Sequence, residues 1–329
     1  MKWGIIGAGS IARKFAGTVV RMQSEGEELT AIASRDQAKA DAFRAEFGAA
    51  RAYGSYESMI RDTDVNAVYV ATPNVFHYDN VRMCLLAGKH VLCEKPFTVN
   101  AGQARELYAL AREKGLFVME AFWIRLMPLL LKMREFIAGG EIGEVRHVRC
   151  DFGFVPGEGL SERKRTLKLA AGALLDIGIY NLGFVHMIMD AAPIRFSSTV
   201  RFNDFGSDDF SAVLLEYPGG RSASIVTAIG MNMPREAVVY GSEGSLHFPD
   251  YQQAQRMTVR RYGQEAYEIE IPFEINGFEY QIREVSRCVA LGMTTSDVLR
   301  EQDTLTVLET MDALRESWGL RYEADEPAR

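Results

Sequence analysis

The chain has 329 residues, of which 47% are hydrophobic and 25% are charged. The length suggests two or three domains, and the composition is typical of a globular protein and excludes a disordered or collagen-like chain. The net charge of −7, from 37 basic and 44 acidic side chains, argues against nucleic acid as a partner, because phosphate binding needs a concentrated positive surface.

Cysteine usage and hydropathy bear on the compartment. The cysteines at 84, 93, 150 and 288 form no C-x-x-C pair, so neither a zinc site nor a disulfide framework is indicated. No segment reaches the about 18 consecutive apolar residues that span a bilayer, and the apolar start runs into a glycine turn, unlike a signal peptide. We therefore expect a cytoplasmic protein with reduced cysteines, no metal and no membrane partner.

Short apolar segments alternate with longer helix-like segments in the first third of the chain. The predicted strands are 3–6, 29–33, 67–71, 90–93 and 116–119, and the predicted helices between them are 11–23, 37–47, 77–87 and 101–114. The strands are apolar throughout, as in a parallel sheet covered on both faces. The pattern predicts an α/β fold with a doubly wound parallel sheet over residues 1–122.

The pattern changes in the second part of the chain. Strand-like segments with turn signals between them are predicted at 145–154, 196–201, 212–217, 222–228, 237–240, 257–261 and 267–271, and helices at 278–291 and 302–317. They predict a C-terminal α+β domain, residues 123–329, with an open and mainly antiparallel sheet.

A glycine-rich turn, Gly7-Ala8-Gly9-Ser10-Ile11-Ala12, follows the first predicted strand and opens a helix. In a Rossmann site, Gly7 permits the tight turn, Gly9 lets the backbone approach a pyrophosphate, and the helix N-terminus attracts the anion. A turn without a ligand is the alternative, but the strand–turn–helix context favours a dinucleotide site with Gly7, Gly9, Ser10 and Ile11.

The end of the second predicted strand bears on cofactor choice. A site for NAD usually presents an acidic residue there, whereas this chain has Ser34 and Arg35, followed by Lys39. A hydroxyl and guanidinium suit a 2′-phosphate, so NADP is predicted. Asp36 keeps NAD open as a cofactor, and a solvated Arg35 beside Asp36 is the alternative interpretation.

Polar residues follow the next two predicted strands. Thr72-Pro73-Asn74 and His77 come after one strand, and Glu94-Lys95-Pro96 comes after the next. Residues past the carboxyl ends of parallel strands surround the ligand crevice, so these residues are predicted to contact the cofactor, with Lys95 near the nicotinamide. A surface lysine paired with Glu94 is the alternative.

Later segments supply further candidates. Trp123 and Arg125 follow the strand at 116–119 and could border the crevice, although interdomain packing explains Trp123 equally well. The cluster Arg163-Lys164-Arg165 could approach a polar substrate, although a solvated loop explains it better. Asp176 and Tyr180 are four apart and share a face if the segment is helical. A phenol and a carboxylate side by side suit proton transfer, whereas core packing is the alternative for Tyr180.

These motifs, in this order and together with Leu175-Asp176-Ile177-Gly178-Ile179-Tyr180, resemble the glucose–fructose oxidoreductase family of NAD(P)-dependent oxidoreductases, which includes inositol dehydrogenases. The Ile-Gly-Ile-Tyr form is similar to the branch with dimeric dihydrodiol dehydrogenase and NADP-dependent xylose dehydrogenases. The resemblance implies that Lys95 and Tyr180 are the catalytic pair, that Asp176 contacts substrate or orients the site, and that the C-terminal sheet forms a homodimer or higher homo-oligomer.

Three functions are compatible with these residues. The first is an NADP-dependent dehydrogenase of an aldose or cyclic diol, in which Tyr180 accepts the hydroxyl proton and Lys95 stabilises the phenolate. The second is NADPH-dependent reduction of a dicarbonyl or ketosugar, which is the same chemistry reversed. The third is a non-catalytic regulator that senses NADP. The intact set of Lys95, Asp176 and Tyr180 argues against it, because a sensor needs no acid–base residues.

Overall fold

A computed structural model describes residues 1–157 and 166–325. The chain divides into two compact units. The first unit comprises Met1–Trp123 and Glu274–Thr304, and the second comprises Ile124–Phe273 and Leu305–Arg329. The sequence-based domains, 1–122 and 123–329, remain a prediction.

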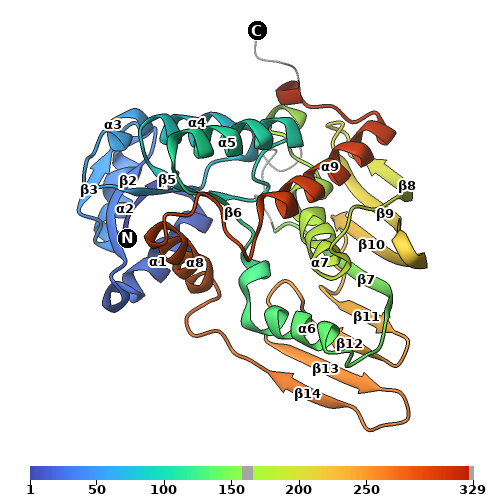
Figure 1. The fold of residues 1–329 in the computed structure, drawn as a ribbon. Coiled ribbons are helices and arrows are strands. Elements are labelled where there is room, and N and C mark those ends of the chain that lie inside the picture. Colours follow the sequence, from blue (N-terminus) through green and yellow to red (C-terminus); the bar gives the residue numbers. More distant parts are fainter. Residues whose placement is uncertain (158–165, 326–329) are drawn as a thin grey trace. The chain divides into compact units, whose positions relative to one another are not determined.

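A six-stranded parallel sheet forms the centre of the first unit (Figure 1). Its order is β3-β2-β1-β4-β5-β6, so the direction of winding reverses between β1 and β4, where the ligands of such sheets bind. The strands are β1 (Lys2–Ile6), β2 (Glu28–Ala33), β3 (Arg51–Tyr53), β4 (Ala67–Val70), β5 (His90–Glu94) and β6 (Val118–Ala121). The predicted doubly wound sheet is confirmed.

Local capping determines where the helices of the first unit begin and end. Asp36 and Asn100 accept hydrogen bonds from the first turns of α2 (Gln37–Phe47) and α5 (Ala101–Lys114), and a left-handed glycine ends each helix. Both helices have the predicted bounds. The remaining helices are α1 (Ser10–Arg21), α3 (Tyr56–Ile60), α4 (His77–Leu86) and α8 (Glu279–Ala290).

The segment Glu274–Thr304 belongs to the first unit although it lies far along the chain. Asn276 donates to Thr18 Oγ1 at 2.9 Å, Arg283 pairs with Glu25, and Ser286 donates to Glu27. Thr18 lies on α1, and Glu25 and Glu27 come shortly after it. This segment therefore fixes the helix that follows the glycine-rich turn.

An eight-stranded sheet, in the order β14-β13-β12-β11-β7-β10-β9-β8, forms the second unit. The pair β7–β10 is parallel and the remaining pairs are antiparallel, which confirms a mainly antiparallel sheet. The strands are β7 (Val145–Phe154), β8 (Arg195–Phe202), β9 (Asp208–Tyr217), β10 (Arg221–Ile229), β11 (Ala237–Gly241), β12 (Gly244–Phe248), β13 (Arg256–Arg261) and β14 (Tyr267–Glu270).

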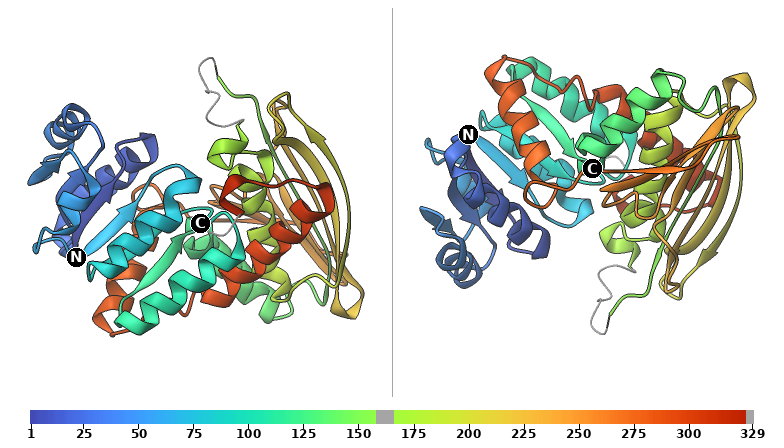
Figure 2. Two further views of the ribbon diagram at one scale, coloured as in Figure 1. Left: turned by 90° about the horizontal axis from the view of Figure 1, so that it is seen from above. Right: turned by 90° about the horizontal axis from the view of Figure 1, so that it is seen from below.

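The helices of the second unit that the structure describes lie on one face of this sheet (Figure 2). They are α6 (Pro128–Ala138), α7 (Ile179–Met189) and most of α9 (Glu301–Trp318). Leu167–Met189 is long and apolar enough to cross a membrane, yet 94% of its most apolar window is buried inside the fold. Such burial is typical of a core helix, and every residue of α7 is buried.

Candidate active site

Gly7 forms the turn after β1 and leaves no room for a side chain. Its φ is +101°, which disfavours any residue with a Cβ. A Cβ there would lie 2.7 Å from the carbonyl oxygen of Ala71, just past β4, and the Gly7 N–H donates to Ala33 O at 3.0 Å. The turn is therefore held against the ends of both neighbouring strands, β2 and β4.

Gly9 differs, because it faces open space. It is the N-cap of α1, with no side-chain capping bond and no acidic residue in the first turn. A Cβ at Gly9 would meet no atom within 4 Å. The exposed start of α1, at Ser10 and Ile11, therefore offers backbone N–H groups and a positive helix end beside a space without side chains. These features fit the pyrophosphate of a dinucleotide.

The side chains after β2 divide into two roles. Asp36 Oδ1 accepts the Lys39 backbone N–H at 3.4 Å, its other oxygen lies 3.8 Å from Lys39 Nζ, and the Asp36 N–H donates to Ser34 Oγ at 3.3 Å. Asp36 is thus engaged in starting α2. Arg35 is exposed, with its guanidinium 5.8 Å from the ring centre of Phe76. Phe76 was not predicted as a site residue, although it lies between the predicted contact residues Asn74 and His77.

His77 contacts both the turn after β4 and the turn after β5 from inside the fold. Its side chain is fully buried, with Nε2 2.8 Å from Thr72 O and Nδ1 2.8 Å from Pro96 O. Burial lowers the pKa of His77. Because both ring nitrogens face backbone carbonyls, His77 links the turns after β4 and β5, and the direct cofactor contact that the sequence predicted stays a prediction. Thr72-Pro73-Asn74 forms the first of these turns, and Asn80 donates to Thr72 Oγ1 at 3.1 Å.

Lys95 begins the turn after β5, and its side chain is half-buried. The buried Glu94 accepts hydrogen bonds from the Tyr69 hydroxyl and from the Lys95 backbone N–H. Burial raises the pKa of Glu94, while the charges of Lys95 and Lys14 oppose that rise. Glu94 therefore supports the Lys95 turn from within the unit.

Trp123 packs within the first unit. Its ring centre lies 5.2 Å from that of Phe278, and the Lys14 ammonium lies 4.3 Å from the centre of each ring. Burial lowers the pKa of Lys14, and the carboxylates of Glu94 and Glu279 counteract this effect. No local signal in the sequence pairs Lys14 with Phe278, so this cation–aromatic cluster was missed.

Two other candidates have different outcomes. Arg125 is only 2% exposed and lies in the short helix Trp123–Leu126, and its place at the border of the cofactor crevice stays a prediction. The cluster Arg163-Lys164-Arg165 lies outside the described residues.

Asp176 and Tyr180 lie on one continuous helical segment of the second unit, as predicted, but its first turn is wider than an α-helix. Leu174–Gly178 is a π-helical turn that leads directly into α7. Asp208 caps the turn by accepting the Leu174 N–H at 2.6 Å, and burial raises the pKa of Asp208 to about 6. Such π-turns are frequent at functional sites.

Buried contacts fix Tyr180 and the start of α7. Tyr180 is 7% exposed, and its ring centre lies 5.9 Å from that of Phe152. The neighbouring Asn181 donates to Thr227 Oγ1 at 2.9 Å and accepts from the Tyr251 hydroxyl. Burial raises the pKa of Tyr251, and a negative charge on Tyr180 would raise it further. The two phenols are therefore electrostatic neighbours.

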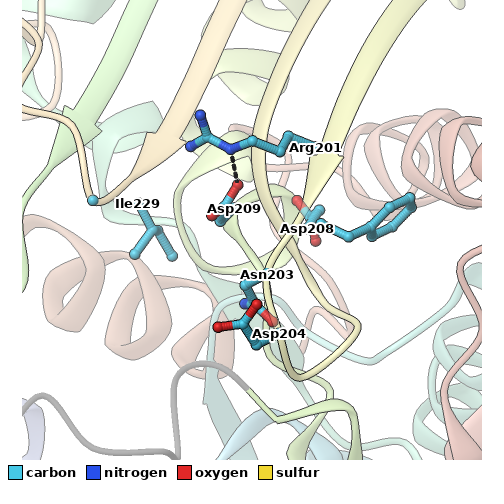
Figure 3. Close-up of a pocket in the computed structure, with 8 residues that line it drawn as sticks. Arg201, Asn203, Asp204, Asp208, Asp209 and Ile229 are labelled. Atoms are coloured by element: carbon cyan, nitrogen blue, oxygen red, sulfur yellow. Dashed lines mark hydrogen bonds and ion pairs between the residues drawn. The ribbon is translucent and has the colours of Figure 1, made fainter.

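A pocket of about 310 Å³ opens at the turn between β8 and β9 (Figure 3). It is lined by Arg201, Phe202, Asn203, Asp204, Asp208, Asp209, Ile229 and Gly230. Arg201 pairs with Asp209 at 2.7 Å. Asp208 belongs both to this pocket and to the cap of the turn that carries Asp176.

Comparisons with known proteins cover nearly the whole chain. Residues 1–122 match the oxidoreductase family with an NAD-binding Rossmann fold, and residues 130–247 match the GFO/IDH/MocA C-terminal domain. Two relatives are the trans-1,2-dihydrobenzene-1,2-diol dehydrogenases of Mus musculus and Homo sapiens, which are 34% and 32% identical to this chain. Each match covers 99% of this chain and 99% of the relative.

Solved structures also match this chain over nearly its full length. A 3-ketoreductase from Actinomadura kijaniata, in complex with NADP and TDP-benzene, has a TM-score of 0.86 and 29% identity, covering 96% of this chain and 97% of that chain. An aldose-aldose oxidoreductase from Caulobacter crescentus, complexed with glycerol, has a TM-score of 0.85 over the same shares, but its 24% identity supports the fold alone.

Gly9→Ala tests the dinucleotide site. We expect it to cost at most about 1 kcal/mol of unfolding free energy, because the new Cβ meets no protein atom. The dissociation constant for NADP should rise roughly tenfold or more, since the methyl group fills the space that the pyrophosphate needs. Thermal melting and calorimetric titration measure the two effects. Unchanged affinity in the folded variant would place the pyrophosphate elsewhere.

Proposed function

The chain belongs to the GFO/IDH/MocA family of oxidoreductases, and from this premise we propose that it uses NADP to oxidise a hydroxyl-bearing carbon of an aldose or a cyclic diol. Family membership makes it an NAD(P)-dependent dehydrogenase acting on CH–OH groups. The preference for NADP, the substrate class and the roles of individual residues constitute the proposal.

The observation that carries the proposal is the convergence of three turns in the first unit. The turns that contain Gly9, Thr72 and Lys95 follow β1, β4 and β5, which are neighbouring parallel strands. All three leave the carboxyl end of the sheet, and the reversal between β1 and β4 lies among them. A dinucleotide in a doubly wound sheet occupies this position.

We assign the choice of NADP to Arg35. Asp36, the acidic residue that would favour NAD, is engaged with the start of α2 through Lys39. Arg35 at the end of β2 is exposed, as is Lys39, and a guanidinium suits a 2′-phosphate. The NADP in the related 3-ketoreductase supports this assignment.

Bound nicotinamide would supply the hydride acceptor. The chain's own residues handle the proton. Tyr180 accepts the hydroxyl proton at its phenol oxygen, the Lys95 ammonium stabilises the phenolate, and Asp176 contacts the substrate or orients Tyr180. In the reverse direction, Tyr180 returns the proton to a carbonyl oxygen.

The relatives bear on the substrate. The dihydrodiol dehydrogenases match over the full length, which supports a cyclic diol. The 3-ketoreductase favours the second candidate, NADPH-dependent reduction of a ketosugar or dicarbonyl. A panel of aldoses, polyols, dihydrodiols and ketosugars with both cofactors separates the two directions. NADP binding without turnover across the panel would instead support the third candidate, a regulator.

We also propose that the protein forms a homodimer through the sheet of the second unit. The described helices lie on one face of that sheet. The opposite face carries Leu214 on β9, which is 43% exposed, and the half-buried His147 and Tyr240, which pair across β7 and β11. A sheet face that no helix of its own unit covers is commonly buried against a partner.

Arg35→Ala tests the cofactor preference. Loss of a charged contact of about 1.5–3 kcal/mol should raise the Michaelis constant for NADP⁺ roughly tenfold to a hundredfold, while that for NAD⁺ changes little. Arg82→Ala, at an exposed arginine of α4, is the matched control and should affect neither. Equal effects of Arg35→Ala on the two cofactors would contradict the assignment.

Light scattering tests the assembly. At micromolar concentration the molar mass should be that of a dimer or larger, and Leu214→Glu should shift it toward the monomer, because burying an unpaired charge at an interface is costly. A strictly monomeric wild-type protein would rule out the dimer.

Tyr180→Phe tests the chemistry. Removing the hydroxyl should lower turnover by about 10²–10⁴-fold, while NADP⁺ affinity stays near wild type, because the dinucleotide is proposed to bind the first unit. Tyr262→Phe, at a 58% exposed tyrosine of the same unit, is the control. Near-normal turnover in folded, NADP-binding Tyr180→Phe would remove Tyr180 from the mechanism.

Lys95→Met should also depress turnover. The effects of Lys95→Met and Tyr180→Phe on turnover should be non-additive in the double variant, because the two residues are proposed to act as a unit.

A further inference from the structure

One peptide group in the turn that carries Lys95 is held at both of its polar ends. The carbonyl oxygen of Pro96 lies 2.8 Å from His77 Nδ1, and the N–H of Phe97 donates to Glu120 Oε1 at 2.9 Å. Carbonyl and N–H belong to the same Pro96–Phe97 peptide. Two buried side chains from opposite sides of β5, His77 after β4 and Glu120 on β6, therefore fix the backbone next to Lys95.

Glu120 connects three parts of the first unit. It lies beside Cys93 in the register of β5 and β6, and it is only 3% exposed. Its Oε1 binds the turn at Phe97, and its Oε2 accepts the Thr304 hydroxyl at 3.0 Å, near the start of α9. A neutral amide could supply similar hydrogen-bond partners, so geometry alone leaves open why a carboxylate occupies this position.

The charges around Glu120 explain why a carboxylate rather than an amide is useful at this position. Burial raises the pKa of Glu120 to about 7, the charge of Glu94 adds to this effect, and the charge of Lys95 opposes it. The ionisable groups that interact with Glu120 include Cys93 and Glu94 on β5, Lys95 on the turn and Tyr108 on α5. Lys95 is the cation among these four groups, so the ionised Glu120 interacts favourably with its ammonium.

We propose that Glu120 is a positioning residue for Lys95, whose ionised carboxylate holds the Pro96–Phe97 peptide and stabilises the Lys95 ammonium. This inference rests on the proposed function, in which Lys95 assists proton transfer. When Glu120 takes up a proton, the charge-assisted hydrogen bond from Phe97 weakens and the Lys95 ammonium loses a counter-charge. Turnover should therefore fall as the pH drops through about 7.

Glu120→Gln tests the proposal because the amide keeps the shape and an acceptor for the Phe97 N–H but cannot ionise. Turnover at pH 8 should fall roughly tenfold, from the loss of one charge-assisted interaction. The Michaelis constant for the cofactor should change much less. The decline of wild-type turnover through about pH 7 should be absent from the variant.

A second variant changes the pKa of Glu120 without removing its carboxyl group. Thr304→Val deletes the hydroxyl that donates to Oε2, and this hydrogen bond lowers the pKa of Glu120. The decline in turnover should therefore begin at a higher pH than in the wild type. The control is Glu27→Gln, at a buried glutamate that accepts the Trp3 indole N–H at 2.6 Å. It should keep the wild-type pH profile.

Infrared titration of the cofactor-free protein gives a readout independent of activity. The C=O stretch of protonated Glu120 is read from the difference between the wild-type and Glu120→Gln spectra, in which bands of other carboxyl groups such as Asp208 cancel. This difference band should appear as the pH falls through about 7, and it should shift to higher pH in Thr304→Val. An unchanged band or an unchanged pH profile in Glu120→Gln would overturn the inference, and so would an unmoved band in Thr304→Val.

Lys95→Met, assayed in parallel, separates this inference from the proposed function. Normal turnover in Lys95→Met would contradict the role of Lys95 itself. Loss of turnover in Lys95→Met beside a wild-type profile in Glu120→Gln would contradict only the role of Glu120.

Discussion

The close approach between the turn after β1 and the end of β4 is the constraint on which the candidate site depends. Gly7 has φ of +101° and would place a Cβ 2.7 Å from Ala71 O, so the backbone itself is the contact surface there. This contact brings the start of α1 next to the turn that contains Thr72. The anion-binding end of the helix and the polar turns of the site thus share one edge of the sheet.

Buried polar side chains, and not apolar packing alone, hold the turns after β4 and β5 in place. His77 joins the turns after β4 and β5, Glu94 joins Lys95 to Tyr69, and Glu120 holds Phe97. Each of these side chains is fully or nearly fully buried, and buried polar groups are costly unless they are hydrogen-bonded. The same bonds that satisfy them therefore restrict the position of Lys95.

Most of the architecture could be predicted from the sequence, because local signals agreed with the fold. The helices predicted at 37–47 and 101–114 have the bounds of α2 and α5, which Asp36 and Asn100 cap, and the apolar strands indicated the parallel sheet. Strand β6 begins two residues later than expected, since Leu116 donates to Ala111 O and completes the end of α5. Strand β3 has only three half-buried residues, which gives no recognisable apolar pattern.

The site was less predictable where contacts join distant segments. The sequence pointed to Gly7, Gly9 and Lys95 through their place after strands. The pairing of Lys14 with Phe278 and of Glu120 with Thr304 depends on residues far apart in the chain. The π-helical turn before α7 depends on Asp208, whose capping role has no local signature.

The most direct test of the central claim is the fate of the carbinol hydrogen. A substrate from the diol and aldose panel, deuterated at the hydroxyl-bearing carbon, is incubated with the wild-type enzyme and NADP⁺, and the nucleotide is analysed by mass spectrometry and proton NMR. Direct hydride transfer predicts deuterium at the nicotinamide C4 of NADPH and a slower turnover of the deuterated substrate. Oxidised product with unlabelled NADPH, its deuterium lost to water, would contradict the account.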